Sequence, residues 1–187
     1  RTFKGEDQGP LFELGVAHYR KKLYSEAIKA FKESIRLDPA SATTYYRLGL
    51  CYRETKSVDD AMAAFEKAVD LGITNGYAQF ELGKIYNDKG NVEGALRVLK
   101  SAVQLKPDLV DAYIELGNVY YNDKRPADAI PHYNRALELS PKYVTAALYL
   151  GDAYLNAKRY EEAIQAYSKT LELDAANTGA LYGLGLV

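Results

Sequence analysis

Residues 110–143 read VDAYIELGNVYYNDKRPADAIPHYNRALELSPKY, and the pattern of this segment recurs along the chain. Its Leu116-Gly117 pair is followed by Ala129, twelve residues after the glycine. The same Leu-Gly pair returns every 34 residues without an insertion, and its glycines are Gly15, Gly49, Gly83, Gly117, Gly151 and Gly185. A fixed period of this length is typical of repeat proteins, in which each unit is one supersecondary element.

Other columns repeat at the same period. Three residues after the glycine stand His18, Tyr52, Tyr86, Tyr120 and Tyr154. Twelve residues after it stand Ala27, Ala61, Ala95, Ala129 and Ala163. Sixteen residues after it stand Phe31, Phe65, Leu99, Tyr133 and Tyr167. Since these columns are apolar or aromatic, we expect them to form the core.

The apolar spacing inside each unit is helical. Leu48 and Tyr52, and then Ala61 and Phe65, lie four residues apart and therefore share one helical face. A short polar break separates the two runs, so each unit predicts two helices. Ser57 and Asn91 are expected N-caps of their second helices. The expected helices cover residues 10–22, 25–38, 42–56, 59–71, 76–89, 92–105, 110–123, 127–139, 144–157 and 160–173, with a further one from residue 178.

Glycine inside a helix costs about 0.8–1 kcal/mol relative to alanine, so the glycine column needs a physical reason. We expect each glycine to allow close approach of the small alanine on the paired helix, as Gly117 and Ala129 would do. One helix pair cannot bury its apolar face alone, and the units should therefore stack into a shared core.

The chain has 187 residues, with 24 basic and 25 acidic side chains and a formal charge of −1. This balance disfavours a nucleic-acid binder, which normally shows a basic excess. The sequence contains no run of about 18 apolar residues, so we expect no membrane span. Residues 1–8 lack the apolar core of a signal peptide. We expect a soluble protein, with the cytoplasm as the favoured compartment. The start at Arg1 in place of Met predicts an excised or processed piece.

No pattern for catalysis stands out. The G-x-x-x-x-G-K-[ST], H-E-x-x-H and G-x-S-x-G motifs are all missing. His18, His132 and the lone Cys51 fall in repeat columns, where packing is the simpler interpretation. A single cysteine cannot form an internal disulfide. One Cys and two His are also too few for a structural zinc site, which usually takes four ligands. We therefore expect a protein that is not an enzyme, with no catalytic residues, no metal and no cofactor.

The columns resemble the motif of the tetratricopeptide repeat family, through Leu14-Gly15, Ala27, Phe31, Ser34 and Pro39 and their later equivalents. The resemblance implies an all-α fold, an α-solenoid of tandem 34-residue helix-turn-helix repeats that form a right-handed superhelix. An N-terminal tail at residues 1–7 and a repeat domain at 8–187 are expected. The expected units are residues 8–41, 42–75, 76–109, 110–143 and 144–177, with a partial sixth at 178–187.

The same resemblance implies a concave groove, lined by the first helix of each pair, that binds a peptide or helix of a partner protein. It places on the groove wall the residues three before, one after and four after each core glycine, with a few neighbours. These are Phe12, Val16, Tyr19, Tyr46, Leu50, Arg53, Tyr77, Phe80, Lys84, Asn87, Ile114, Asn118, Tyr121, Asn122, Leu148, Asp152 and Leu155.

The composition of this wall bears on the partner. Exposed aromatic residues are typical of binding hot spots, and asparagine side chains both donate to and accept from a peptide backbone. The Lys/Asn/Arg clamp with which one subclass of the family binds acidic chaperone tails is not evident. In the fourth and fifth units the wall and its neighbours carry Asp111, Glu115 and Asp152 with no basic residue, so the partner should place basic residues there.

The sequence therefore predicts a protein–protein interaction scaffold. One alternative is a substrate-recruiting repeat module from a larger enzyme, such as a transferase. Another is a self-assembling structural block. The segment 179–187 is nearly all apolar, so we also expect self-association through this end or a longer natural chain.

Overall fold

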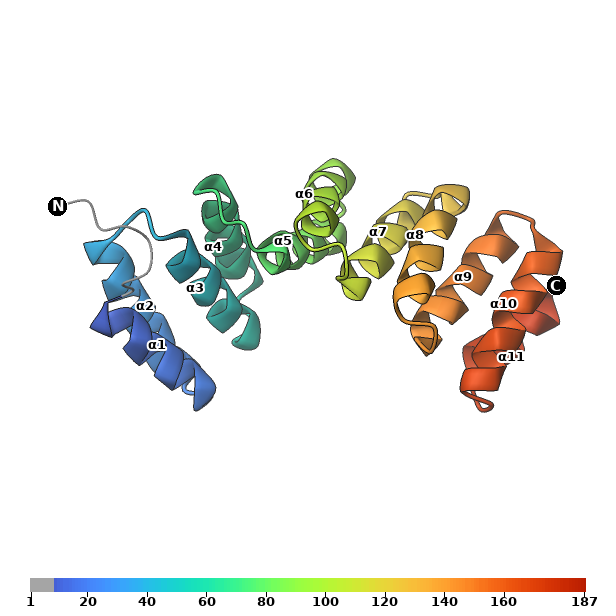
Figure 1. Cartoon of the computed structure of the whole chain (residues 1–187), viewed down its shortest axis with the longest axis horizontal. Coiled ribbons are helices and arrows are strands. Elements are labelled where there is room, and N and C mark those ends of the chain that lie inside the picture. Colours follow the sequence, from blue (N-terminus) through green and yellow to red (C-terminus); the bar gives the residue numbers. More distant parts are fainter. Residues whose placement is uncertain (1–8) are drawn as a thin grey trace. The chain divides into compact units, whose positions relative to one another are not determined.

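The computed structural model describes residues 9–187, and the expected tail at residues 1–7 lies outside this part. The described chain is all-α, with eleven helices and no strand (Figure 1). The helices are α1 Pro10–Arg20, α2 Tyr24–Leu37, α3 Ala42–Glu54, α4 Val58–Asp70, α5 Gly76–Asp88, α6 Val92–Leu105, α7 Val110–Asn122, α8 Pro126–Leu139, α9 Val144–Asn156, α10 Tyr160–Leu173 and α11 Thr178–Leu186. Tandem helix pairs, as expected from the 34-residue columns, make up the chain.

The chain divides into two compact units, Arg1–Ile85 and Tyr86–Val187. We call them the N-terminal unit and the C-terminal unit. The N-terminal unit holds α1 to α4 and most of α5, and the C-terminal unit holds the last turn of α5 and all of α6 to α11.

In the N-terminal unit, α1 packs on α2, α2 on α3 and α3 on α4. Phe31 on α2 and Phe65 on α4 are fully buried at the centres of these pairs. The Phe12 ring lies 5.7 Å from the Phe31 ring, and the Tyr46 ring lies 6.0 Å from the Phe65 ring. The second helices thus supply the central aromatic residues, and the first helices close over them.

The C-terminal unit repeats this arrangement. α7 packs on α8, α9 packs on both α8 and α10, and α11 contacts α9 and α10. Tyr133 on α8 and Tyr167 on α10 occupy the places that Phe31 and Phe65 take in the N-terminal unit, and both are almost fully buried. Pro131 lies inside α8 without ending it.

The glycine column has a different neighbour from the one expected. A Cβ placed on Gly151 would lie 2.6 Å from the Tyr167 ring, and one placed on Gly49 would lie 2.6 Å from the Phe65 ring. The nearest atoms are thus those of the aromatic residue sixteen positions later, and not those of the alanine twelve positions later. Gly15, Gly49, Gly117 and Gly151 each open a notch in a first helix that an aromatic ring of the paired second helix fills.

The first helices end earlier than expected, because a residue with positive φ closes them. Lys22, Lys56, Lys124 and Lys158 have φ of 60–61°, and Gly90 stands at the same place in the third unit with φ 72°. The amide after this residue donates back to a helix carbonyl, as from Ser57 to Tyr52 at 2.9 Å. This bond satisfies a carbonyl that would otherwise be left free at the helix end.

One of the two expected caps forms. The Asn91 side chain accepts from the Gly94 amide at 3.0 Å at the start of α6. Ser57 precedes α4 but makes no side-chain cap hydrogen bond, so that expectation is wrong. Across residues 9–187, no helix has both the length and the apolar character needed to cross a bilayer.

Candidate functional site

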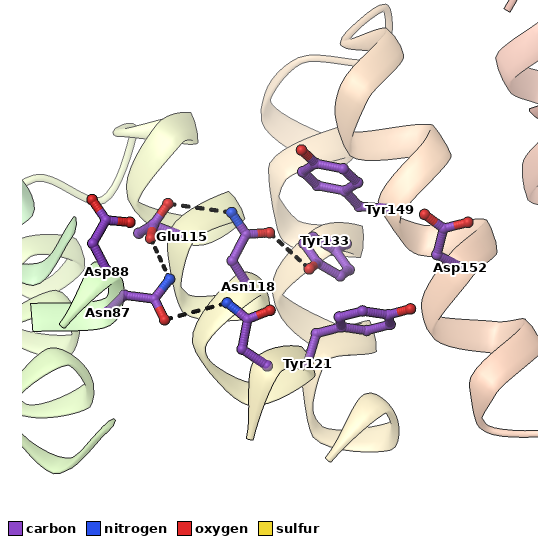
Figure 2. Close-up of a pocket in the computed structure, with 9 residues that line it drawn as sticks. Asn87, Asp88, Glu115, Asn118, Tyr121, Tyr133, Tyr149 and Asp152 are labelled. Carbon is purple, nitrogen blue, oxygen red and sulfur yellow. Dashed lines mark hydrogen bonds between the residues drawn. The ribbon is translucent and has the colours of Figure 1, made fainter. Parts of the chain in front are cut away.

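The C-terminal unit carries a hollow of about 350 Å³. We call it the C-terminal hollow. Its lining residues are Asn87, Asp88, Glu115, Asn118, Tyr121, Asn122, Tyr133, Tyr149 and Asp152. Figure 2 shows eight of these side chains labelled, with Asp88 and Asp152 at opposite ends of the row in this view.

First helices supply nearly all of the lining. Asn87 and Asp88 come from the end of α5, four residues come from α7, and Tyr149 and Asp152 come from α9. Only Tyr133 belongs to a second helix, α8. Its ring fills the notch at Gly117, and its hydroxyl thereby reaches the wall formed by α7.

Glu115 is the hub of the hydrogen bonds in the hollow (Figure 2). Its Oε1 accepts from Asn87 Nδ2 at 2.7 Å, and its Oε2 accepts from Asn118 Nδ2 at 3.2 Å. Two further donors stand behind these amides. The Tyr133 hydroxyl donates to Asn118 Oδ1 at 2.9 Å, and Asn122 Nδ2 donates to Asn87 Oδ1 at 3.4 Å. These four hydrogen bonds therefore form one network that ends at the Glu115 carboxylate.

Asp152 stands at the other end of the hollow. Its Oδ1 accepts from the Tyr167 hydroxyl at 2.7 Å. Burial raises the pKa of the Asp152 carboxyl, and the Tyr167 hydrogen bond lowers it in part. Burial also raises the pKa of Tyr121, and the charge of Asp152 raises it further. The net effect of burial is to disfavour charge on Asp152.

A pairing of two repeat columns explains why tyrosine replaces phenylalanine in the C-terminal unit. Tyr133 pairs with Asn118 and Tyr167 with Asp152, and each partner is the residue after the core glycine. In the first two units that position holds Val16 or Leu50, and the aromatic residue is a phenylalanine. From its column position Tyr133 was expected only to pack in the core, whereas its hydroxyl also forms part of the hydrogen-bond network. The joint change of the two columns was the available signal.

The charged side chains that line the hollow are all negative. The lining contains three carboxylates and no Lys or Arg. Within the described chain, no basic side chain forms an ion pair with Asp88, Glu115 or Asp152. Lys124 lines a neighbouring hollow of about 220 Å³, together with Tyr121, Pro126 and Asn156.

The structure brings five of the expected groove residues together in the C-terminal hollow. They are Asn87, Asn118, Tyr121, Asn122 and Asp152. Three further lining residues, Asp88, Tyr133 and Tyr149, were not among the expected site residues, and Glu115 was named only for its charge.

The remaining expected residues of the C-terminal unit lie elsewhere. Ile114 is buried in the core beside Tyr120 and Tyr133. Leu148 and Leu155 are half-buried and pack against the cluster of Ala163, Tyr167 and Ala180. A partner would meet little of Ile114.

The N-terminal unit places its expected residues in two ways. Phe12 and Leu50 are buried, and the partly buried Val16 and Tyr19 pack on the cluster that includes Phe12. Others stay open to solvent or half-buried, and these are Tyr46, Arg53, Tyr77, Phe80 and Lys84.

Two of these open residues are held by neighbours. Arg53 forms ion pairs with Glu54 and Glu81. The Lys84 ammonium lies 5.4 Å from the centre of the Phe80 ring.

The histidine and cysteine side chains show packing environments. The His132 ring stacks on Tyr120 at 5.3 Å, and burial lowers the pKa of His132. Burial raises the pKa of Cys51 to about 12, so its thiol is neutral near pH 7. Within residues 9–187, no three His, Cys, Asp or Glu side chains gather as metal ligands would.

The repeated helix pairs and their columns define a helical-repeat protein. The sequence matches the tetratricopeptide repeat description over residues 12–76 and 114–180, and a second TPR repeat description over residues 83–124. The chain therefore belongs to the tetratricopeptide repeat family. No curated protein sequence matches it.

Solved structures of TPR proteins share the fold. A MamA structure is 28% identical, with a TM-score of 0.82, over 95% of this chain and 96% of that chain. YrrB, described as a TPR protein with an unusual peptide-binding site, is 23% identical, with a TM-score of 0.87, over 94% and 91% of the two chains. MamA from Desulfovibrio magneticus RS-1, residue 41 to the end, is 22% identical, with a TM-score of 0.80, over 91% and 99%.

Proposed function

We propose that this protein is a non-catalytic interaction scaffold that binds a peptide segment of a partner protein, and that the C-terminal hollow is part of its binding surface. The observation that carries the proposal is the hollow itself, in which amides, tyrosines and carboxylates from α5, α7 and α9 converge. Ligand sites typically occupy about 300–1,000 Å³ and combine apolar walls with a few placed polar groups. The volume of about 350 Å³ falls in this range.

The asparagines suit an extended backbone. Asn122 is exposed at the edge of the hollow, and its amide donates only a long bond of 3.4 Å to Asn87. No hydrogen bond within the described chain uses its Oδ1. An asparagine amide offers both a donor and an acceptor, as a peptide group does, and so pairs with a backbone whatever its side chains are.

The test is a selection of random displayed peptides against the purified protein, followed by affinity measurements on wild type and on two neighbouring variants. Tyr121→Ala removes a ring from the hollow, whereas Tyr120→Ala removes a buried ring that stacks on His132. We expect Tyr121→Ala to weaken binding about tenfold. Tyr120→Ala should lower the free energy of unfolding by about 3–5 kcal/mol instead.

Other results would contradict the proposed binding site. If no peptide is selected, or if the selected peptides bind the Tyr121→Ala variant as tightly as wild type, the proposed site is wrong. A Tyr121→Ala variant that unfolds as readily as Tyr120→Ala while still binding would move the binding surface to another face of the helices.

Self-association is a second candidate function, and exposed apolar side chains on α11 favour it. Leu181 is 53% exposed, Tyr182 71% and Leu186 54%. We propose that this face pairs with a second copy of the chain. Sedimentation equilibrium should then show concentration-dependent dimers that a Leu181→Lys change abolishes. A wild-type protein that stays monomeric across the concentration range would contradict the idea.

A further inference from the structure

We propose that the C-terminal hollow receives an arginine side chain of the partner segment. The inference rests on the peptide-binding function proposed above and adds the chemistry of the residue that is recognised. The guanidinium would pair with Asp152 and lie against the rings of Tyr121 and Tyr149, and the charge of Glu115 would add to the attraction, since all four residues line the same hollow.

Uncompensated negative charge is the first reason. The lining carries three carboxylates and no cation, and no basic residue of the described chain pairs with them. An acidic segment would meet like charge in a partly enclosed site, where water screens less than at an open surface. A cationic side chain supplies the charge that the hollow lacks.

The hydrogen bonds of Glu115 are the second reason. Neutral amides from Asn87 and Asn118 donate to its two oxygens and fix its orientation without removing its charge. The Tyr133 hydroxyl supports Asn118 from behind. A carboxylate held in place before binding loses little conformational freedom when a partner arrives.

The charges of Glu115 and Asp152 both affect the Tyr133 hydroxyl. Burial has the largest effect and raises the pKa of the Tyr133 hydroxyl, Tyr149 and Tyr121 raise it next, and the charges of Glu115 and Asp152 raise it further. Tyr133 therefore lies within electrostatic reach of both carboxylates.

The tyrosine rings favour arginine over lysine. Tyr149 lies beside Tyr133, with the ring centres 5.9 Å apart and the planes inclined by 53° (Figure 2). Tyr121 lines the same hollow from α7. A planar guanidinium stacks on aromatic faces and presents paired donors to a carboxylate, whereas an ammonium is a compact point charge. A volume of about 350 Å³ admits one long side chain and no folded element.

Asp152 has a carboxylate oxygen that can accept further hydrogen bonds. Burial raises the pKa of its carboxyl, which means that its charge is poorly solvated in the free protein. Its Oδ1 already accepts from Tyr167, and no bond within the described chain occupies its Oδ2. A guanidinium would find this acceptor free.

The experiment uses the tightest peptide from the selection, synthesised with arginine, lysine or citrulline at each basic position. Citrulline keeps the shape of arginine and removes the charge. We expect arginine to bind best, lysine less well, and citrulline at least about tenfold more weakly, the size of effect for losing a charged hydrogen bond. Added salt should reduce the difference in affinity between the arginine and citrulline peptides.

Matched protein variants complete the test. Asp152→Asn keeps the shape of the side chain and should weaken the arginine peptide about tenfold while leaving the citrulline peptide unchanged. Glu138→Gln removes the same charge from an exposed position on α8 outside the hollow. It should leave the affinities for the arginine and citrulline peptides unchanged. Thermal melting shows that each variant is folded.

The results separate this inference from the function on which it depends. Peptides that need Tyr121 but bind equally with citrulline would overturn the arginine assignment and leave peptide binding standing. Selected peptides without basic residues, or an Asp152→Asn protein that binds like wild type, would overturn it too. A protein that selects no peptide removes both proposals.

Discussion

At the scale of single residues, a glycine packs against an aromatic ring in four of the helix pairs. A side chain on Gly151 would lie 2.6 Å from Tyr167, which is closer than real carbon atoms approach. The ring is fully buried and cannot turn away without breaking its hydrogen bond to Asp152. Packing therefore outweighs the helix propensity that alanine would add.

Gly151→Ala tests this balance, with Gly185→Ala as its control in the same column. We expect Gly151→Ala to lower the free energy of unfolding by about 1–3 kcal/mol, the usual cost of overpacking. Gly185 has no neighbour within 4 Å of the added carbon. Its replacement should be neutral or stabilising by up to about 1 kcal/mol. Urea titration measures both, and equal effects would contradict the packing argument.

Asp152 yields a prediction about pH. Because its pKa is raised on folding, the folded protein holds the proton more firmly than the unfolded chain. The charged form therefore costs stability above the folded pKa, and this cost disappears as the pH falls towards the ordinary aspartate pKa of about 3.9. Asp152→Asn should raise the free energy of unfolding at pH 7, since its amide oxygen still accepts from Tyr167.

Chemical denaturation of wild type and Asp152→Asn between pH 4 and pH 7 provides the measurement. The advantage of the variant should shrink as the pH is lowered. A variant less stable than wild type at pH 7 would show that the charge is not costly. Together with weaker peptide binding, the expected result would mean that this carboxylate serves recognition at the expense of the fold.

At the scale of helices, the caps distinguish two starts that look alike in sequence. Asn91 caps α6 through the Gly94 amide, whereas Ser57 makes no cap bond at α4. Asn91→Ala should therefore cost about 1 kcal/mol of stability, and Ser57→Ala should stay within about 0.5 kcal/mol. Equal losses in thermal melting would mean that both side chains cap in solution.

Helix ends were the least predictable feature of the elements. The expected helix 42–56 ends at Glu54, because Lys56 takes a left-handed backbone conformation and the following amide bonds back to Tyr52. The third unit has Gly90 at this position, a residue that favours that conformation. Four lysines in the same column concealed the signal, since lysine by itself does not indicate a left-handed turn.

At the scale of the whole molecule, all lining residues of the hollow lie within Tyr86–Val187. Phe65 lies in the other unit, where it is fully buried. We expect Phe65→Ala to lower the stability of the N-terminal unit by about 3–5 kcal/mol while changing peptide affinity less than about twofold. Hydrogen exchange locates the destabilised helices, and calorimetry gives the affinity.

A large loss of affinity in the folded Phe65→Ala protein would contradict this separation. The binding surface would then have to include the N-terminal unit, where Tyr46 and Phe80 are half-buried and Tyr77 is 43% exposed.

The repeat, the helix pairs and the family could be predicted from the amino-acid sequence alone. These features depend on spacings within one 34-residue unit, such as the recurrence of Leu116-Gly117 and Tyr133, and a spacing along the chain can be read without coordinates. The sequence also indicated that Asn87, Asn118 and Asn122 would share a wall and that negative charge would gather near Asp152.

The contacts that these residues make with one another depend on the packing of the helices in three dimensions. Asn87 and Glu115 lie 28 positions apart, and Tyr133 and Asn118 lie 15 apart. Their hydrogen bonds depend on how far one helix stands from the next and on how deeply a ring enters a glycine notch. The same packing buried Phe12, Leu50 and Ile114, which the family resemblance had placed on the groove wall. Column positions fix the direction of a side chain on its helix, but the neighbouring helix determines whether that side chain meets solvent, a partner or the core.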